Sequence, residues 1–120
     1  MATIRSYTTV EQSRKLAEIL PLESADMGWN VFVDDTTRIL PINDWDLVKD
    51  GSGNVKFHYA WSLAALLNVL PNPSLHKTFI GWRCDSYNKE GTTRNLGESA
   101  DNPVDACIAM IEKLHELNLL

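Results

Sequence analysis

Oxygen-bearing side chains between residues 44 and 54 are the first candidates for chemistry. They are Asp44, Asp46, Asp50, Ser52 and Asn54. Hard cations such as Ca²⁺ favour clustered oxygen ligands. A calcium loop that starts at Asp44 would place Val48 at a ligand position and Lys49 at the invariant glycine, so the spacing does not fit. Gly51-Ser52-Gly53 is typical of a hairpin turn, and we expect no metal ion there.

The histidines and cysteines are the second candidates, because together they supply enough ligands for zinc. They are His58, His76, His115, Cys84 and Cys107. Zinc sites are marked by ligand pairs a few residues apart, and no such pair occurs here. His76 and Cys84 are too far apart on one predicted strand to share an ion unless the strand bends. The sequence therefore predicts no metal and no cofactor.

A cysteine–histidine nucleophile is the third candidate. Helical periodicity places Cys107 on a buried face between Val104 and Ile111, which disfavours a polarised, reactive thiol. We expect both cysteines to be reduced and buried, with a disulfide between them as the alternative. No phosphate-binding glycine loop or nucleophile elbow is present. An enzyme would need a cleft formed by residues far apart in the sequence: Asp44, Asp46, His58 and His76. The sequence therefore disfavours an enzyme without excluding one.

The segment 75–96 has the clearest binding character. It carries a net charge of +2, whereas the rest of the chain carries −7. Basic residues alternate there with aromatic ones, which can contact phosphates and stack on bases. The alternative is a solvated sheet face covered by lysine and arginine stems. The candidate binding residues are Lys77, Trp82, Arg83, Tyr87, Lys89 and Arg94.

A first helix is predicted over residues 10–20. Its apolar residues lie on one side, and Pro21 ends it. Two pairs have capping-box spacing, Thr8 with Glu11 and Thr9 with Gln12, and either can start the helix.

Two further helices are predicted over residues 62–70 and 103–117. The first is apolar on nearly all sides and too short to span a membrane, which favours a buried core helix that ends before Pro71. The second begins at Asn102-Pro103, a cap followed by proline at the first helical position. Its apolar stripe consists of Val104, Cys107, Ile108, Ile111, Leu114 and Leu117.

Strands are predicted over residues 29–33, 38–42, 45–49, 55–59, 75–85 and 92–96. Pro41 confines its strand to a sheet edge, and Gly81 indicates a bulge. Residues 97–101 are expected to form a polar connection. The order α-β-ββ-α-ββ-α predicts an α+β fold in which three helices pack on a small, mostly antiparallel sheet. We expect one globular domain over residues 1–120.

Three segments resemble a group of short uncharacterised bacterial proteins of phage-like or mobile-element type. They are Ser24-Ala25-Asp26-Met27, Ala60-Trp61-Ser62-Leu63-Ala64-Ala65-Leu66-Leu67 and Asn102-Pro103-Val104-Asp105-Ala106. Tyr59 stands where members of the group usually have proline. The resemblance implies a shared architecture but no established activity. The curved hairpin followed by a proline-initiated helix is also similar to parts of small antitoxin-like domains with a double-stranded-RNA-binding type of fold, which does not imply a function.

Composition limits the remaining choices. The net charge of −5 argues against a surface devoted to nucleic acid or anionic lipid. The first residues lack an apolar run, so we expect a cytoplasmic protein that does not bind membranes, as a monomer or small homo-oligomer. The leading hypothesis is a non-enzymatic accessory domain that acts through a protein partner. The alternative is a nucleic-acid-binding module that uses the basic hairpin 75–96.

Overall fold

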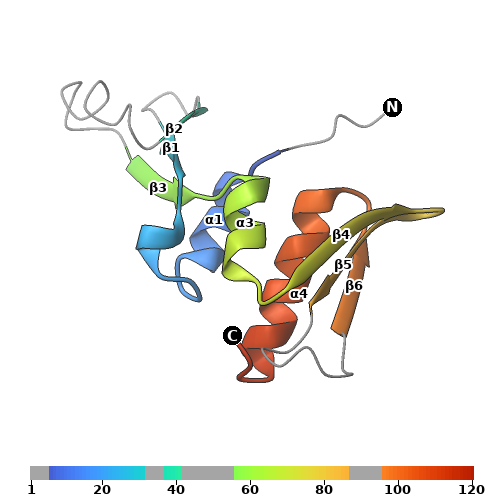
Figure 1. Cartoon of the computed structure of the whole chain (residues 1–120). Coiled ribbons are helices and arrows are strands. Elements are labelled where there is room, and N and C mark those ends of the chain that lie inside the picture. Colours follow the sequence, from blue (N-terminus) through green and yellow to red (C-terminus); the bar gives the residue numbers. More distant parts are fainter. Residues whose placement is uncertain (1–5, 32–36, 42–55, 87–95) are drawn as a thin grey trace. The chain divides into compact units, whose positions relative to one another are not determined.

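The computed structural model describes residues 6–31, 37–41, 56–86 and 96–120 (Figure 1). They form three α-helices, one short 3₁₀ helix and six strands. The strands make two three-stranded antiparallel sheets, which confirms the α+β class and the antiparallel pairing but gives two sheets in place of one. The chain divides into two compact units, described separately below. The prediction of a single domain stays a prediction.

The first unit comprises Thr8–Ser62 and is called the Trp61 unit. Its helix α1, Val10–Leu16, starts with the second of the two predicted capping boxes. Gln12 N–H donates to Thr9 Oγ1 at 3.1 Å, and Thr9 N–H donates to Gln12 Oε1 at 3.0 Å. The helix ends earlier than predicted, and residues 17–19 continue as a turn. A 3₁₀ helix, Leu22–Ser24, follows Pro21.

The sheet of this unit has the order β2-β1-β3. Its strands are β1 (Met27–Val31), β2 (Thr37–Pro41) and β3 (Lys56–Ala60). Pro41 ends β2 at an edge of the sheet, as predicted. Trp29 of β1 is the register partner of Ile39 and of His58, so β1 is central. The expected hairpin turn at Gly51-Ser52-Gly53 and the predicted strand 45–49 lie outside the described residues.

Trp61 is the best-anchored side chain of this unit. It is fully buried, and its indole N–H donates to Ser24 Oγ at 2.9 Å. Its backbone N–H donates to Thr8 Oγ1 at 3.1 Å, and its carbonyl accepts from Thr8 N–H at 3.0 Å. Trp29 is also hydrogen-bonded to Thr8, because its indole N–H donates to the Thr8 carbonyl at 2.7 Å. The indole N–H groups of Trp29 and Trp61 therefore both donate to residues of their own unit.

Two of the segments that carry the family resemblance contact each other here. Ser24 receives the Trp61 indole N–H, and the Asp26 carboxylate accepts from both the backbone N–H and the hydroxyl of Ser62. The indole N–H of the buried Trp61 would be costly to leave without a partner, whereas the bonds of Ser62 to Asp26 lie at an exposed site. The residue types in these two segments therefore have a structural explanation.

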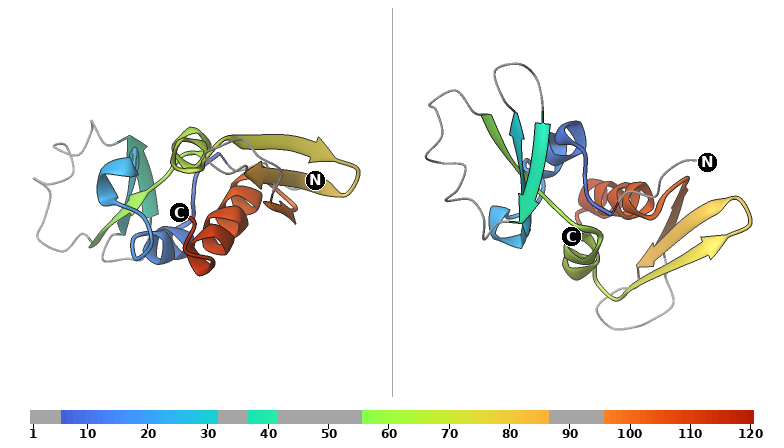
Figure 2. Two further views of the ribbon diagram at one scale, coloured as in Figure 1. Left: turned by 60° about the horizontal axis from the view of Figure 1, so that its bottom comes forward. Right: turned by 90° about the horizontal axis from the view of Figure 1, so that it is seen from above.

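The second unit comprises Leu63–Leu120 with Met1–Tyr7 and is called the hairpin unit. It contains α3 (Leu63–Val69), β4 (Pro73–Thr78), β5 (Gly81–Ser86), β6 (Leu96–Ala100) and α4 (Pro103–Glu116). The sheet order is β4-β5-β6. Helix α4 lies along one face of this sheet, and the β4–β5 hairpin extends beyond β6 (Figures 1 and 2).

Helix α4 begins as predicted. Asn102 Oδ1 accepts from the Asp105 N–H at 2.9 Å, and Pro103 occupies the first turn. The predicted stripe is buried from Val104 to Leu114, but Leu117 is exposed because the helix ends at Glu116. His115 is exposed as well.

Two strand predictions in this unit are wrong. Gly81 does not form a bulge inside one long strand, because the chain reverses at Phe79-Ile80 and Gly81 begins β5. Residues 97–101 are not a polar connection, because β6 covers Leu96–Ala100. Few apolar residues occur in β6, so strand periodicity gave no signal there.

Candidate functional site

The β4–β5 hairpin turns through only two residues. Thr78 and Gly81 are register partners, and Phe79 and Ile80, the hairpin tip, connect them. Gly81 has φ +154°, and a Cβ there would lie 2.5 Å from the Ala100 carbonyl oxygen. Only glycine fits this close approach. The turn end of the hairpin is therefore seated against the end of β6.

The hairpin tip is the most exposed large apolar group in the described part of the chain. Phe79 has a relative exposure of 104% and Ile80 of 82%, whereas the next value, at Leu119, is 58%. Short hairpin turns normally use glycine, asparagine or aspartate. Phe79 and Ile80 are not among these turn-forming residues. Burying their side chains against a partner would remove a large apolar surface from water. Two adjacent residues of this kind are typical of a contact site.

One face of the hairpin presents a cation beside an aromatic ring. Lys77 and Trp82 are direct register partners, so their side chains lie on the same side of the sheet. Lys77 is exposed, and Trp82 is half-buried. Strand alternation places Cys84 on this same side, which is the side that α4 covers. Lys77 and Trp82 therefore lie nearer the hairpin tip on the side of the sheet that faces α4.

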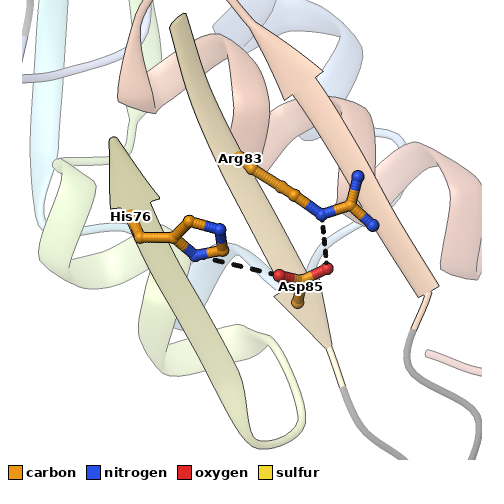
Figure 3. Close-up of polar contacts among 3 residues, drawn as sticks. All are labelled: His76, Arg83 and Asp85. Atoms are coloured by element: carbon orange, nitrogen blue, oxygen red, sulfur yellow. Dashed lines mark hydrogen bonds and ion pairs between the residues drawn. The ribbon is translucent and has the colours of Figure 1, made fainter. Parts of the chain in front are cut away.

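The opposite face holds a buried carboxylate between two basic groups (Figure 3). Asp85 is only 5% exposed, and Arg83 Nε donates to its Oδ1 at 2.9 Å. His76 Nδ1 lies 3.8 Å from Asp85 Oδ2, which is too long for a hydrogen bond. The Arg83 guanidinium thus balances the charge of Asp85 and is not free to bind a phosphate with its full charge.

Gly97 makes room for this ion pair. It is the register partner of Asp85, and a Cβ there would lie 2.1 Å from an Arg83 guanidinium nitrogen and 2.3 Å from Asp85 Oδ1. Any side chain at this position would displace one or both groups. The glycine in β6 is therefore part of the structure that holds Arg83 over Asp85.

Asp85 and His76 place a carboxylate beside an imidazole. A carboxylate can orient a histidine that acts as a general base, but such a base needs a nucleophile within hydrogen-bond reach. Within residues 6–31, 37–41, 56–86 and 96–120, no hydroxyl or thiol is hydrogen-bonded to His76. Of the four residues named for an enzymatic cleft, Asp44 and Asp46 lie outside those ranges, so the predicted convergence stays a prediction.

Three of the six predicted binding residues are described, and the structure divides them between two faces. Lys77 and Trp82 share one face, whereas Arg83 lies on the other. Tyr87, Lys89 and Arg94 lie outside the described residues. The binding surface proposed from these six residues stays a prediction.

Sequence reasoning missed the hairpin tip. Phe79 and Ile80 look like the interior of a strand, because both are strong strand formers and Gly81 follows them. The one signal that could have located the reversal is Gly81 itself. A glycine in a strand pattern indicates either a bulge or a close backbone approach, and here it marks the close approach.

Cys84 and Cys107 lie together between β5 and α4. Both are fully buried, and their thiols are hydrogen-bonded to each other. This hydrogen bond lowers the pKa of Cys84, although burial and the nearby Asp85 charge oppose the shift. The same bond, together with burial, raises the pKa of Cys107. The prediction of two buried reduced thiols is confirmed, and the two residues prove to be neighbours.

Other observations give no competing site. No protein-family model, curated protein or solved structure matches this chain. Among the described residues, no three histidine, cysteine or acidic side chains are grouped so that they could hold a metal ion. None of the helices in the described ranges has the length and apolar character needed to cross a membrane. The hairpin tip is the candidate site that the exposure of Phe79 and Ile80 supports.

Proposed function

We propose that this protein is a non-enzymatic binding domain whose hairpin tip inserts into an apolar pocket of a partner protein. The observation that carries the proposal is the near-complete exposure of Phe79 and Ile80 at a two-residue turn. Large aromatic and aliphatic side chains that fill a partner's pocket contribute most of the binding energy in many interfaces.

The hairpin that carries the tip is held in place before any partner binds. Strand β5 pairs with β4 on one side and with β6 on the other, up to the pair of Trp82 with Ala100. Gly81 rests against the Ala100 carbonyl. Because the backbone next to the tip is already ordered, little conformational entropy is lost there on binding.

A protein partner fits this surface better than a nucleic acid. Phosphate contacts need free cations, and Arg83 is paired with the buried Asp85. Lys77 lies on the other face from Arg83, so the two cannot follow one phosphate backbone along a single side of the sheet. Nucleic-acid binding through residues 75–96 stays the alternative, and its steep salt dependence distinguishes it.

The cellular location and the accessory role that we propose rest on the sequence alone. We place the protein in the cytoplasm as an accessory protein, and its relation to phage-like or mobile elements stays a prediction.

The proposal is tested by affinity capture with three immobilised versions of the full chain. They are the unchanged protein, the tip variant Phe79→Ser/Ile80→Ser and the control variant Leu117→Ser/Leu119→Ser. The control removes two apolar residues that are also exposed, at 44% and 58%, from the segment that follows α4. A partner specific to the tip is retained by the control variant and lost by the tip variant.

The recovered partner is then purified, and its Kd is measured by calorimetry at two salt concentrations. The tip variant is expected to bind at least about tenfold more weakly, because two buried apolar side chains are lost. Equal binding by all three versions contradicts the proposal. Binding to nucleic acid that disappears as salt rises, with no change in the tip variant, supports the alternative instead.

A further inference from the structure

The two cysteines of the chain meet at the centre of the hairpin unit although they are 23 positions apart. Strand alternation in β5 puts Cys84 on the same side of the sheet as Trp82, and that side faces α4. The helical period of α4 puts Cys107 among its buried residues, one turn after Val104. Neither thiol has measurable exposure.

We infer that Cys84 and Cys107 form a reversible dithiol–disulfide site that links β5 to α4. Both thiols are fully buried where α4 packs on β5, so a disulfide would join two side chains that already share one interface. The link would fix the strand that follows the hairpin tip to the helix behind it. This inference is independent of the proposed function.

The oxidant is a low-molecular-weight disulfide, with glutathione disulfide as the probe. Because neither thiol is exposed, the reaction proceeds through a transient opening between β5 and α4. One cysteine thiolate then attacks a glutathione sulfur, which forms a mixed disulfide and releases one glutathione thiolate. The second cysteine loses its proton to solvent and attacks the protein sulfur of the mixed disulfide, which releases the second glutathione thiolate. Two protein thiols are oxidised, and one glutathione disulfide is reduced to two glutathione molecules.

Because the fold keeps the two thiols close, the disulfide should form more favourably in the folded protein than in the unfolded chain. In the unfolded chain the two cysteines meet only by loop closure, whereas the fold holds them together. The whole protein is equilibrated with glutathione buffers of graded ratio, both in native buffer and in concentrated urea. Trapped samples are then separated by mass spectrometry, and the effective concentration of one thiol toward the other is calculated for each state.

We expect the native effective concentration to exceed the urea value by at least about tenfold. By the thermodynamic cycle, this ratio equals the gain in the free energy of unfolding of the oxidised protein over the reduced protein. A tenfold ratio corresponds to about 1.4 kcal/mol. A linked peptide that contains both cysteines in a monomer, with a mass loss of two hydrogens, identifies the bond.

A native value equal to or below the urea value overturns the inference, and so does oxidation that yields only intermolecular dimers. The single variants Cys84→Ser and Cys107→Ser serve as controls and should give only the mixed disulfide with glutathione. The decisive comparison uses the unchanged protein, so it does not depend on the folding of either variant.

Discussion

Trp61 and Phe79 are both large aromatic residues next to a change of chain direction, and the protein uses them in opposite ways. Trp61 is fully buried, and both its indole N–H and its backbone amide have partners within its own unit. Phe79 stands outside the packed structure, with Ile80 beside it. Trp61 thus stabilises the fold, whereas Phe79 and Ile80 carry the contact surface that we propose.

The energetic reason for this difference is direct. Burying a large aromatic ring removes apolar surface from water, and the segment from Ala60 to Ser62 gains that stabilisation during folding. The hairpin tip gains nothing comparable when the chain folds, so its apolar surface remains for a later contact. If this comparison is correct, substitutions in the two regions should separate stability from binding.

The largest expected effect is at Trp61. Replacement by alanine should lower the free energy of unfolding by about 3–5 kcal/mol, because it leaves a cavity and frees Ser24 from the indole. Urea denaturation followed by circular dichroism measures this loss. The matched variant Phe79→Ala should unfold at the same urea concentration as the unchanged protein. Equal losses at the two positions would break the comparison.

Gly81 should show an intermediate effect, because it joins the exposed tip to the ordered sheet. Gly81→Ala is expected to cost about 1–3 kcal/mol, since the new Cβ meets the Ala100 carbonyl and φ is unfavourable for alanine. Ser99→Ala, at an exposed position of β6, is the control and should change stability by less than about 0.5 kcal/mol. A Gly81→Ala protein with unchanged stability would show that the tip is not seated on β6.

Arg83 tests whether the charged face of the hairpin is structural. Arg83→Met should destabilise the protein by about 1–2 kcal/mol, because Asp85 is left buried without its partner. The double variant Arg83→Met/Asp85→Asn should cost less than the sum of the two single changes, measured as a double-mutant cycle in denaturant. Full additivity would mean that the two side chains do not stabilise each other.

The smallest expected effect on stability is at the tip itself. Phe79→Ser/Ile80→Ser should leave the unfolding midpoint unchanged, because neither side chain is packed in the folded protein. Differential scanning calorimetry alongside the unchanged protein measures this. A clear loss of stability would show that the tip packs against part of the chain. It would then contradict the contrast drawn between the buried Trp61 and the exposed tip.

Local signals in the sequence predicted the helices well. The capping box of Thr9 and Gln12 and the Asn102-Pro103 start both occur in the structure, because caps act within a few residues. The edge position of β2 also followed from one proline. The two separate sheets could not be predicted, because strand pairing depends on contacts between distant residues that periodicity does not encode.

The candidate site was less predictable than the fold. Residues 75–96 drew attention through their charge and aromatic content, but no pattern indicated that Arg83 would be paired with Asp85. The reversal at Phe79-Ile80 lacks the usual turn residues, so it looked like continuous strand. The contact between Cys84 and Cys107 depends on how α4 packs on β5, which is a tertiary property.

The central claim is that the hairpin tip contacts a partner protein, and site-directed photo-crosslinking tests it most directly. A benzophenone amino acid is placed at Phe79, and in a second protein at Leu119, which is exposed at 58%. After irradiation in cell extract with and without nuclease, we predict one discrete protein adduct from position 79 that nuclease does not alter and that position 119 does not form. Identical adducts from both positions, or adducts to nucleic acid alone, would contradict the account.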